Sequence, residues 1–357
     1  MWNIRRSTDE DTVKSLERYF SVVKNNLPAK FRICKRVPIE ADLDSETNKL
    51  WKSHQEGLKK FENLLHKIDE EEVELNEISL ADPSLLDLKS EIGRRILESC
   101  HFCERRCNVN RNKNNTGVCG VGKTARIASE FIHHGEEPEL VPSYTIFFSG
   151  CTFKCQFCQN WNISQNPKSG IEYSPNEISS KIEEKKRKNV KNVNWVGGDP
   201  TPNLHNVLSS LNKCETNLPS VWNSNMYLSE EGMKLLSGTQ DIYLTDFKYG
   251  SNECALKYSK VPDYWEIISR NHKKAFSNSE IIIRHLVLPK HVECCTKKIL
   301  KWIEEELGPH TRVNLMGQYR PAGKASEYSE ISRPVSKEEM DRAFQIAEEV
   351  GLKNVIG

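Results

Sequence analysis

Hydrophobic residues recur along this chain in two different arrangements, one over residues 1–97 and the other beyond the connector that begins near residue 131. In the first part, apolar residues return every three or four positions among lysines and glutamates, most clearly over residues 50–65 and 85–96. This spacing predicts amphipathic helices that each bury one face, and Asp82-Pro83-Ser84 is a suitable start for the second helix. We interpret both as packing helices. The alternative is that their apolar stripes form a docking surface for a protein partner.

From residue 141 onward, short apolar runs alternate with helical stretches. Six runs are predicted to be strands, at residues 143–149, 191–196, 218–222, 241–245, 280–288 and 311–316. Helical spacing occupies the segments between them, at residues 175–188, 202–213, 229–236, 252–276 and 292–306. This repeated order predicts an α/β fold with a parallel sheet, and six such units can form a partial (β/α)6 barrel of the TIM type. The expected domains are a helical N-terminal region (1–97), a cysteine-rich metal-binding segment with a connector (98–140), and the barrel (141–357).

Composition and charge exclude several classes of protein. The 357 residues include 51 Lys and Arg against 50 Asp and Glu, so no net field draws the chain to nucleic acid or to an anionic membrane. No apolar run approaches the roughly eighteen residues of a membrane span, and residues 1–10 lack the apolar core of a signal peptide. We therefore expect a cytoplasmic protein that binds neither nucleic acid nor membrane. Its twelve cysteines then favour metal ligation, because cytosolic thiols stay reduced.

Three cysteines in the spacing C-x3-C-x2-C directly follow the first predicted barrel strand: Cys151, Cys155 and Cys158. Closely spaced thiolates suit zinc or an iron–sulfur cluster. A structural zinc usually takes four protein ligands, whereas three cysteines on a [4Fe-4S] cluster leave one iron open to a substrate or cofactor. The alternatives are a zinc site completed by a distant residue and buried cysteines without a ligand.

Four further cysteines, the upstream quartet, precede the barrel: Cys100, Cys103, Cys107 and Cys119. Because turn-forming residues separate them, their thiolates can surround one zinc ion or hold an auxiliary iron–sulfur cluster. Unligated structural cysteines are the alternative. Arg105 and Arg111 can offset the negative charge of a cluster. His133 and His134, in the polar connector that follows, are expected to be linker or surface groups.

Polar residues also follow other predicted strands, whose carboxyl ends meet at one mouth of a barrel. They are Gly197-Gly198-Asp199-Pro200, Asn223-Ser224-Asn225, Asp246-Phe247-Lys248 and Arg284-His285. Two adjacent glycines allow close backbone approach and leave carbonyl groups available to an ammonium group. The simpler interpretation is that these polar residues only close the ends of strands and that His285 is a core histidine. Cys294 and Cys295 are expected to be structural.

Two segments together resemble the radical S-adenosylmethionine (radical SAM) superfamily. They are the cysteine loop, which carries Cys151, Cys155 and Cys158 with Phe157 before the last cysteine, and the segment Gly197-Gly198-Asp199-Pro200. Further motifs are similar to proteins related to the pyruvate formate-lyase activating enzyme. They are Asp246-Phe247-Lys248-Tyr249, Arg284-His285-Leu286-Val287-Leu288-Pro289 and Asn314-Leu315-Met316-Gly317-Gln318-Tyr319. The resemblance covers residues 95–357. Because the quartet lies before the barrel, unlike the cysteine inserts of known activating enzymes, pyruvate formate-lyase itself is not expected as the substrate.

The resemblance implies a [4Fe-4S] cluster on the three loop cysteines, with S-adenosylmethionine (SAM) beside it, in a partial barrel of the radical SAM type. It implies that Gly197, Gly198 and Asp199 contact the amino group of SAM and that Phe157 contacts the adenine. It also implies that Asn223 and Ser224 bond to the ribose or the carboxylate, and that Arg284 bonds to the carboxylate. Asp246 and Lys248 would form an active-site pair or a cation site.

The implied activity is that of a radical SAM oxidoreductase, which cleaves SAM reductively to a 5′-deoxyadenosyl radical that abstracts hydrogen from a substrate. An electron donor such as flavodoxin or ferredoxin would supply the electron. The narrower expectation is an activase that installs a glycyl radical on a partner protein. Modification of another peptide or of a small molecule is the alternative among enzymes, and a metal–sulfur module that only binds a partner is the alternative outside them. No catalytic side chain is identified.

Overall fold

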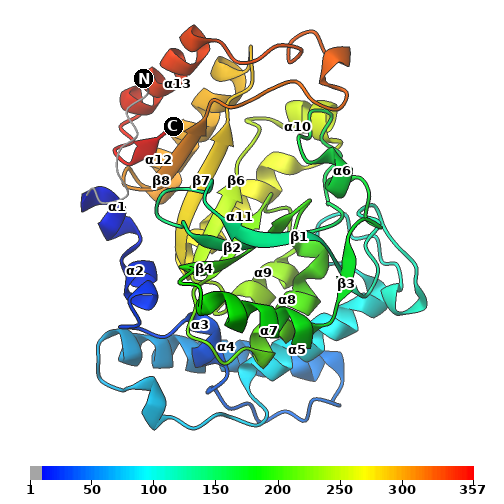
Figure 1. The fold of residues 1–357 in the computed structure, drawn as a ribbon, viewed down its shortest axis with the longest axis vertical. Helices are drawn as coiled ribbons and strands as arrows, with labels where there is room; N and C mark the ends of the chain where they lie inside the picture. The colour runs from blue at the N-terminus through cyan, green and yellow to red at the C-terminus, as the bar shows by residue number, and fades with distance from the viewer. Residues whose placement is uncertain (1–9) are drawn as a thin grey trace.

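The computed structural model describes residues 10–357, and its nine strands form one mixed sheet in the order β3-β1-β2-β4-β5-β6-β7-β8-β9 (Figure 1). Neighbouring strands from β2 onward run parallel: β2 (Ser143–Phe148), β4 (Asn192–Gly197), β5 (Ser220–Ser224), β6 (Ile242–Asp246), β7 (Glu280–Leu286), β8 (Arg312–Met316) and β9 (Val355–Ile356). The first six of these are the predicted barrel strands. The predicted α/β fold is therefore confirmed.

Two antiparallel strands that the sequence did not predict extend the sheet beyond β2. β1 (Ala125–His133) pairs with β2, and β3 (Ile171–Tyr173) pairs with β1. Much of β1 is only partly buried or exposed, so it lacks the continuous apolar run of a parallel strand. Because β3 and β9 are the two edges, the barrel stays open. In Figure 1, β1 and β2 run across the view while β7 and β8 run along it, which shows the twist of the sheet.

Helices connect the parallel strands. They are α6 (Trp161–Ser164), α7 (Pro175–Lys186), α8 (Leu204–Lys213), α9 (Glu230–Leu236), α10 (Asn252–Ser259), α11 (Tyr264–Asn278), α12 (Lys297–Leu307) and α13 (Lys337–Glu349). The predicted helical segment 252–276 consists of two helices, because the chain turns between α10 and α11. Lys260 and Asp263 adopt left-handed conformations, with φ of 57° and 48°. Pro262 between them disfavours helical geometry in the residue before it.

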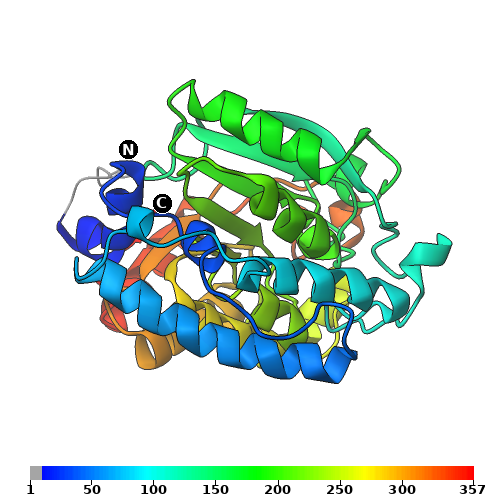
Figure 2. The ribbon, with the colours of Figure 1, turned by 90° about the horizontal axis from the view of Figure 1, so that it is seen from below.

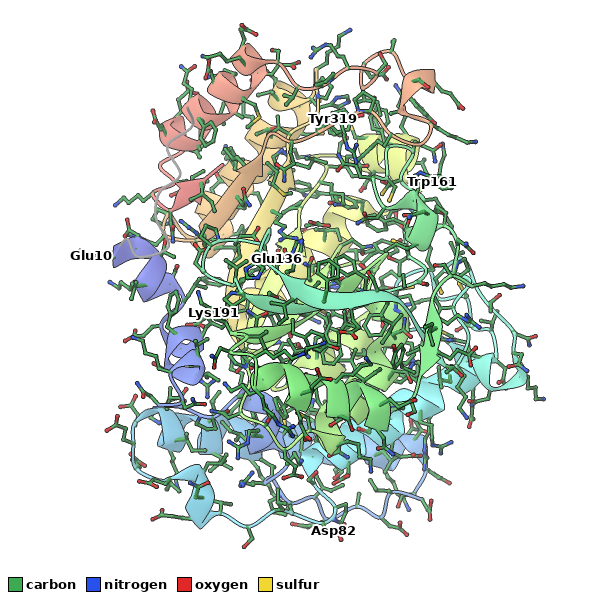
Figure 3. All side chains as sticks on the ribbon, in the orientation of Figure 1. Glu10, Asp82, Glu136, Trp161, Lys191 and Tyr319 are labelled. Atoms are coloured by element: carbon green, nitrogen blue, oxygen red, sulfur yellow. The ribbon has the colours of Figure 1, made fainter. Side chains whose placement is uncertain are left out.

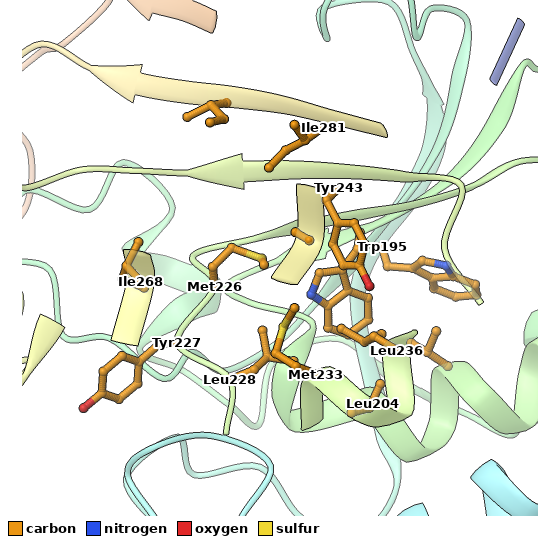
Figure 4. Close-up of a cluster of buried hydrophobic side chains, with 14 of the residues drawn as sticks. Trp195, Leu204, Met226, Tyr227, Leu228, Met233, Leu236, Tyr243, Ile268 and Ile281 are labelled. Carbon is orange, nitrogen blue, oxygen red and sulfur yellow. The ribbon is translucent and has the colours of Figure 1, made fainter. Parts of the chain in front are cut away.

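The N-terminal helices pack on the barrel and share its core. They are α1 (Glu10–Ser15), α2 (Glu17–Val23), α3 (Lys30–Cys34), α4 (Thr47–Asp69) and α5 (Leu85–Ile96). Ser84 caps α5 by accepting a hydrogen bond from the Asp87 amide, which confirms the predicted helix start. Figure 2 shows α4 and α5 side by side beneath the sheet, and α5 also packs on α8. Their buried side chains belong to the same apolar cluster as Trp195 and its neighbours in Figure 4. Residues 1–9 of the predicted helical region lie outside the described part of the chain.

The first two helices close the amino end of the barrel. Leu16 and Tyr19 are buried against Val221, Ile242 and Ile282, which lie near the starts of β5, β6 and β7. Because this end is filled, the mouth of the barrel is at the carboxyl ends of the strands, where βα loops carry reactive groups. Among residues 10–357, no helix combines the length and apolar character needed to cross a bilayer.

Candidate active site

The cysteine loop, residues 149–160, leaves β2 at the mouth of the barrel and buries its first cysteine. Cys151 is 6% exposed. Its sulfur accepts hydrogen bonds from the Phe153 amide at 3.3 Å and from the Asn225 side-chain amide at 3.7 Å. Such donors stabilise a thiolate and help to set the potential of a cluster that the thiolate binds.

The other two loop cysteines are partly exposed and have hydroxyl neighbours. The Ser259 hydroxyl donates to the Cys155 sulfur at 3.0 Å, and the Ser164 hydroxyl lies 3.2 Å from the Cys158 sulfur. Burial and the neighbouring Cys158 thiol raise the pKa of Cys155 to about 11. A metal that binds here must therefore displace protons, because only the thiolate is a ligand.

The three loop sulfurs are spread more widely than the ligands of a single metal ion. A tetrahedral zinc with Zn–S bonds of about 2.3 Å keeps its thiolates about 4 Å apart. Within residues 10–357, the three loop sulfurs do not all lie within 4.8 Å of one another. In a [4Fe-4S] cluster each cysteine binds a different iron, which sets the sulfurs farther apart. The loop sulfurs therefore do not form the compact set that a single zinc ion requires.

Gly197 and Gly198 let the end of β4 lie directly against the end of β2. A Cβ atom at Gly197 would be 2.1 Å from the Phe148 carbonyl oxygen, and one at Gly198 would be 2.1 Å from that of Gly150. Gly197 also has a φ of +122°, which other residues rarely adopt. The Gly198 amide donates to the Phe148 carbonyl at 2.8 Å, and the Asp199 amide donates to the Gly150 carbonyl at 3.0 Å. The two glycines thus hold the cysteine loop against the next strand.

Asp199 is buried and joins three segments of the mouth. Its carboxylate accepts hydrogen bonds from the amides of Thr201 and Asn225, both at 2.9 Å, and from the Ser224 hydroxyl at 3.0 Å. A carboxylate offers about four acceptor positions, so these three bonds leave one for another donor, such as an ammonium. Burial raises the pKa of Asp199, although these donors act to lower it. The structure therefore brings the predicted residues Asp199 and Ser224 together.

Two asparagines inside the barrel have buried side-chain atoms without hydrogen-bond partners. Asn223 on β5 leaves its amide nitrogen unpaired, and Asn194 on β4 leaves both side-chain polar atoms unpaired. Buried polar groups are normally bonded, so these atoms indicate a place for a polar ligand or for water. Asn194 was not among the predicted site residues. Its signal is the alternation Asn192-Val193-Asn194 within a predicted strand, which puts both asparagines on one face.

Arg284 lies beside two acidic side chains of the connector, and its predicted contact with the cofactor carboxylate stays a prediction. Its guanidinium forms ion pairs with Glu136 and Glu137, and the distance from Nε to the Glu137 carboxylate is 2.7 Å. Burial acts to raise the pKa of Glu137, but Arg284 outweighs it and lowers that pKa. The connector is therefore not simply polar and solvated, since its Glu139 is also buried, in an ion pair with Arg312. Figure 3 marks Glu136 within the molecule.

Asp246, the last residue of β6, forms an ion pair with Lys248, with 2.7 Å between Nζ and a carboxylate oxygen. Burial acts to lower the pKa of Lys248, but Asp246 and the Cys155 thiol outweigh it and raise that pKa. The ammonium therefore stays charged beside the cysteine loop. A positive charge there favours thiolates and offsets a negatively charged cluster.

Phe157 and His285, two other residues singled out from the sequence, have buried side chains. Phe157 is buried, and its ring packs edge-on against Tyr319 with 5.7 Å between the centroids. Its contact with adenine stays a prediction. His285 bonds to the Phe247 carbonyl at 2.7 Å and to a threonine hydroxyl at 2.8 Å, as expected of a core histidine.

The upstream quartet lies next to the cysteine loop. Arg105 donates to the carbonyl of Thr152, within that loop, at 3.1 Å. Arg111 is buried, with one nitrogen 3.7 Å from the Cys100 sulfur. In the described part of the chain, no three sulfurs of the quartet lie within 4.8 Å of one another. Their spacing is wider than a single zinc requires, and the metal that they bind stays a prediction.

Sequence comparisons relate this chain to known proteins. A family model described as "Radical SAM superfamily" matches residues 145–303, which include the cysteine loop and the Gly-Gly-Asp segment. "Uncharacterized protein MJ0674" of Methanocaldococcus jannaschii is 48% identical over 343 residues, which cover 94% of this chain and 98% of that protein. "Uncharacterized protein MJ0808" of the same organism is 26% identical over 277 residues, or 72% of this chain and 79% of that protein.

Two solved structures are similar at a lower level. Streptococcus suis SuiB bound to precursor peptide SuiA is 14% identical, with a TM-score of 0.44, over 57% of this chain and 46% of that chain. HydG, a maturase of the [FeFe]-hydrogenase, is 12% identical, with a TM-score of 0.42, over 95% of this chain and 66% of that chain. The chain thus spans less than half the length of SuiB.

Proposed function

We propose that this chain, which carries a radical SAM superfamily domain over residues 145–303 and with it a [4Fe-4S] cluster and SAM, abstracts hydrogen from a polypeptide substrate at the mouth of its barrel. The observation that supports this proposal is the placement of three cysteine sulfurs, each with a polar neighbour, on one loop at the mouth of the barrel. When bound, the cluster and SAM supply one-electron cleavage of the sulfonium to a 5′-deoxyadenosyl radical.

The protein's own contribution begins with the three loop cysteines, which would ligate the cluster and leave one iron without a protein ligand. The hydrogen bonds to their sulfurs would tune the potential of the cluster, and Lys248 would offset its negative charge. Because Cys155 and Cys158 are partly exposed, they would hold the cluster near the surface. This position suits an electron donor such as flavodoxin or ferredoxin.

The polar groups beside the loop would orient SAM. Asp199 has an acceptor position left for the methionyl ammonium, and the Gly197-Gly198 backbone lies against the same loop. The unpaired amide groups of Asn194 and Asn223 offer hydrogen bonds to ribose or carboxylate oxygens. Ser224 acts through Asp199, because its hydroxyl is bonded to that carboxylate. The guanidinium of Arg284 is paired with two glutamates, so its contact with the carboxylate stays a prediction.

A polypeptide substrate is favoured by the surface next to the cysteine loop. Trp161 follows Cys158 closely and is 58% exposed, and Figure 3 shows it on the outside of the molecule at α6. Ile171 is 67% exposed on the edge strand β3. An exposed tryptophan and a free sheet edge suit an extended chain, which can pair with the edge and cover the apolar side chains. A glycyl radical enzyme would be one such partner.

SAM cleavage is the test of the reaction class. Full-length protein reconstituted anaerobically with iron and sulfide should form 5′-deoxyadenosine from SAM and dithionite. Cys155→Ala should abolish the product, whereas Cys214→Ala, at a buried cysteine outside the site, should retain it. Cluster-loaded protein that makes no 5′-deoxyadenosine would instead support a module that only binds a partner.

Deuterium transfer tests the substrate class. The reconstituted protein would be incubated with an extract of the native organism grown in deuterated medium, divided by ultrafiltration into macromolecules and small molecules. We expect deuterium in 5′-deoxyadenosine from the macromolecular fraction, and its loss after that fraction is digested with protease. Transfer from the small-molecule fraction alone would refute a polypeptide substrate and leave the reaction class intact.

A further inference from the structure

Cys254, His291 and Cys294 form a third cluster of metal-ligating side chains, separate from the cysteine loop and the quartet. One ligand atom from each lies within 4.8 Å of the other two, and among residues 10–357 no other group of three or more His, Cys, Asp or Glu residues is as compact. In a tetrahedral zinc site, bonds of about 2.3 Å to sulfur and 2.0–2.1 Å to nitrogen place the ligand atoms about 3.5 to 4 Å apart. We propose that these three residues bind a zinc ion.

The imidazole of His291 is oriented as a metal ligand requires. Its Nδ1 lies 2.7 Å from the Pro289 carbonyl oxygen, which can only accept a hydrogen bond. The proton of the neutral ring is therefore on Nδ1, and the lone pair of Nε2 is free to bind a metal. Such a bond from the second nitrogen to a carbonyl is the usual support of a metal-bound histidine. The ring is 6% exposed and packs edge-on against Tyr258, with centroids 5.2 Å apart, so its orientation is fixed.

Cys254 and Cys294 come from two separate elements whose backbones lie in close contact. Cys254 is in the first turn of α10, and Cys294 is in a single π-helical turn, Val292–Thr296, ahead of α12. π-Helical turns are rare and occur often at functional sites. A Cβ atom at Gly250 would be 2.6 Å from the Cys294 carbonyl oxygen, so the close approach of the two segments depends on glycine.

The chemistry of the three ligands selects zinc among the common divalent cations. Thiolate and imidazole ligands suit zinc, whereas magnesium and calcium prefer oxygen. Two thiolates and a neutral imidazole also balance the charge of the ion, which limits the cost of partial burial. Cys294 is exposed, which gives the metal a path from solvent and leaves the fourth position to water. The prediction that Cys294 is purely structural is therefore revised, while its neighbour Cys295 is buried.

Zinc at this place would fix a helix that touches the cysteine loop. α10 carries the ligand Cys254 in its first turn and ends at Ser259. The Ser259 hydroxyl donates a hydrogen bond to the Cys155 sulfur at 3.0 Å. The amides of Lys154 and Gln156 also donate to carbonyls at this end of α10. The ion would therefore hold α10 in place against the cysteine loop, without contacting the reacting groups.

Metal analysis of the full-length protein tests the proposal. We expect His291→Ala and Cys294→Ser each to lose one zinc per chain relative to the unmodified protein, whereas Cys214→Ser, at a buried cysteine outside any such cluster, loses none. Cys254→His keeps a ligand and should retain the zinc. Because Cys294 is exposed, its replacement does not disturb the core. In protein refilled with cobalt, Cys294→Ser should also weaken the sulfur-to-cobalt absorption.

Two results would overturn the zinc site. One is a zinc content and cobalt spectrum unchanged in both His291→Ala and Cys294→Ser. The other is a disulfide between Cys254 and a neighbouring cysteine in protein purified without oxygen, detected by peptide mapping, since oxidised sulfurs cannot hold the metal. Neither readout depends on SAM cleavage, so both are independent of the proposed function.

Discussion

Replacing Gly198 with alanine perturbs the contact between the cysteine loop and β4 with a single methyl group. The added Cβ would lie 2.1 Å from the Gly150 carbonyl oxygen and 2.9 Å from the Ser164 Cα. Both are backbone atoms, so no flexible side chain can move aside. To reach a contact of 3.0 Å, the two segments must separate by about 0.9 Å.

This displacement breaks the hydrogen bonds that join the segments. The bonds from the Gly198 amide (2.8 Å) and the Asp199 amide (3.0 Å) would lengthen beyond the range of a hydrogen bond. Each lost bond costs about 1 kcal/mol, and burying the unpaired groups adds about 1–3 kcal/mol. We therefore expect Gly198→Ala to lower the free energy of unfolding by about 3–5 kcal/mol. Because Cys151 follows Gly150, misplacing the loop by about 1 Å should slow SAM cleavage on the order of 100-fold.

Gly122→Ala is the matched control, because a Cβ atom there would meet nothing within 4 Å. The assays are denaturant unfolding of the apoprotein, iron content after reconstitution, and the rate of 5′-deoxyadenosine formation. Gly122→Ala should match the unmodified protein in all three. If Gly198→Ala unfolds at the same denaturant concentration and binds as much iron as the control, the glycines do not position the loop and the reasoning is wrong.

Three other predictions concern the quartet, the barrel interior and pH. A variant with alanine at all three loop cysteines should keep an iron–sulfur chromophore on the quartet. The reason is that no three quartet sulfurs lie within 4.8 Å of one another among the described residues, which is too far apart for a single zinc ion. Metal analysis that shows zinc, or no metal, on this variant would refute the prediction. Arg284→Met should lower the free energy of unfolding by about 3–5 kcal/mol, because it leaves the buried Glu137 carboxylate without its partner. Lys60→Met, which removes the exposed ion pair with Glu40, should lower it by about 1 kcal/mol or less. Equal effects of the two changes on denaturant unfolding would contradict this prediction. Burial raises the pKa of Glu280 to about 7, so the native state binds its proton more tightly than the unfolded chain, and stability should fall as pH rises from about 4.5 to 7. Glu280→Gln should flatten that part of the pH profile, and an unchanged slope would exclude Glu280 as its source.

The six barrel strands and the helix start at Ser84 were predictable because each depends on local sequence. Buried parallel strands are rich in apolar and β-branched residues, as in β2 and β7, and a capping residue acts on the amide three positions later. β1 and β3 were missed because many of their residues are partly or fully exposed and do not form such apolar segments. The break between α10 and α11 had a local signal, Pro262, that the helical spacing on either side concealed.

The site was predictable where its residues share one motif and not where they meet through the fold. The three loop cysteines and Gly-Gly-Asp stand in short segments. The pairing of Arg284 with Glu137 joins residues 147 positions apart, and a glutamate among other polar residues of a connector gives no sign that it is buried. The approach of Cys254 to His291 likewise depends on the packing of α10 against the segment after β7. Long-range ion pairs and metal clusters of this kind need the three-dimensional structure.

The central claim is that the loop cluster has one iron that no protein ligand occupies and that SAM binds there. Mössbauer spectroscopy of protein reconstituted with ⁵⁷Fe, recorded with and without SAM, tests it most directly. We predict that SAM changes the spectrum of a single iron of the loop cluster and that this change is absent from the triple-alanine variant of the loop. A spectrum that SAM leaves unchanged, or zinc in place of iron on the loop cysteines, would contradict the account.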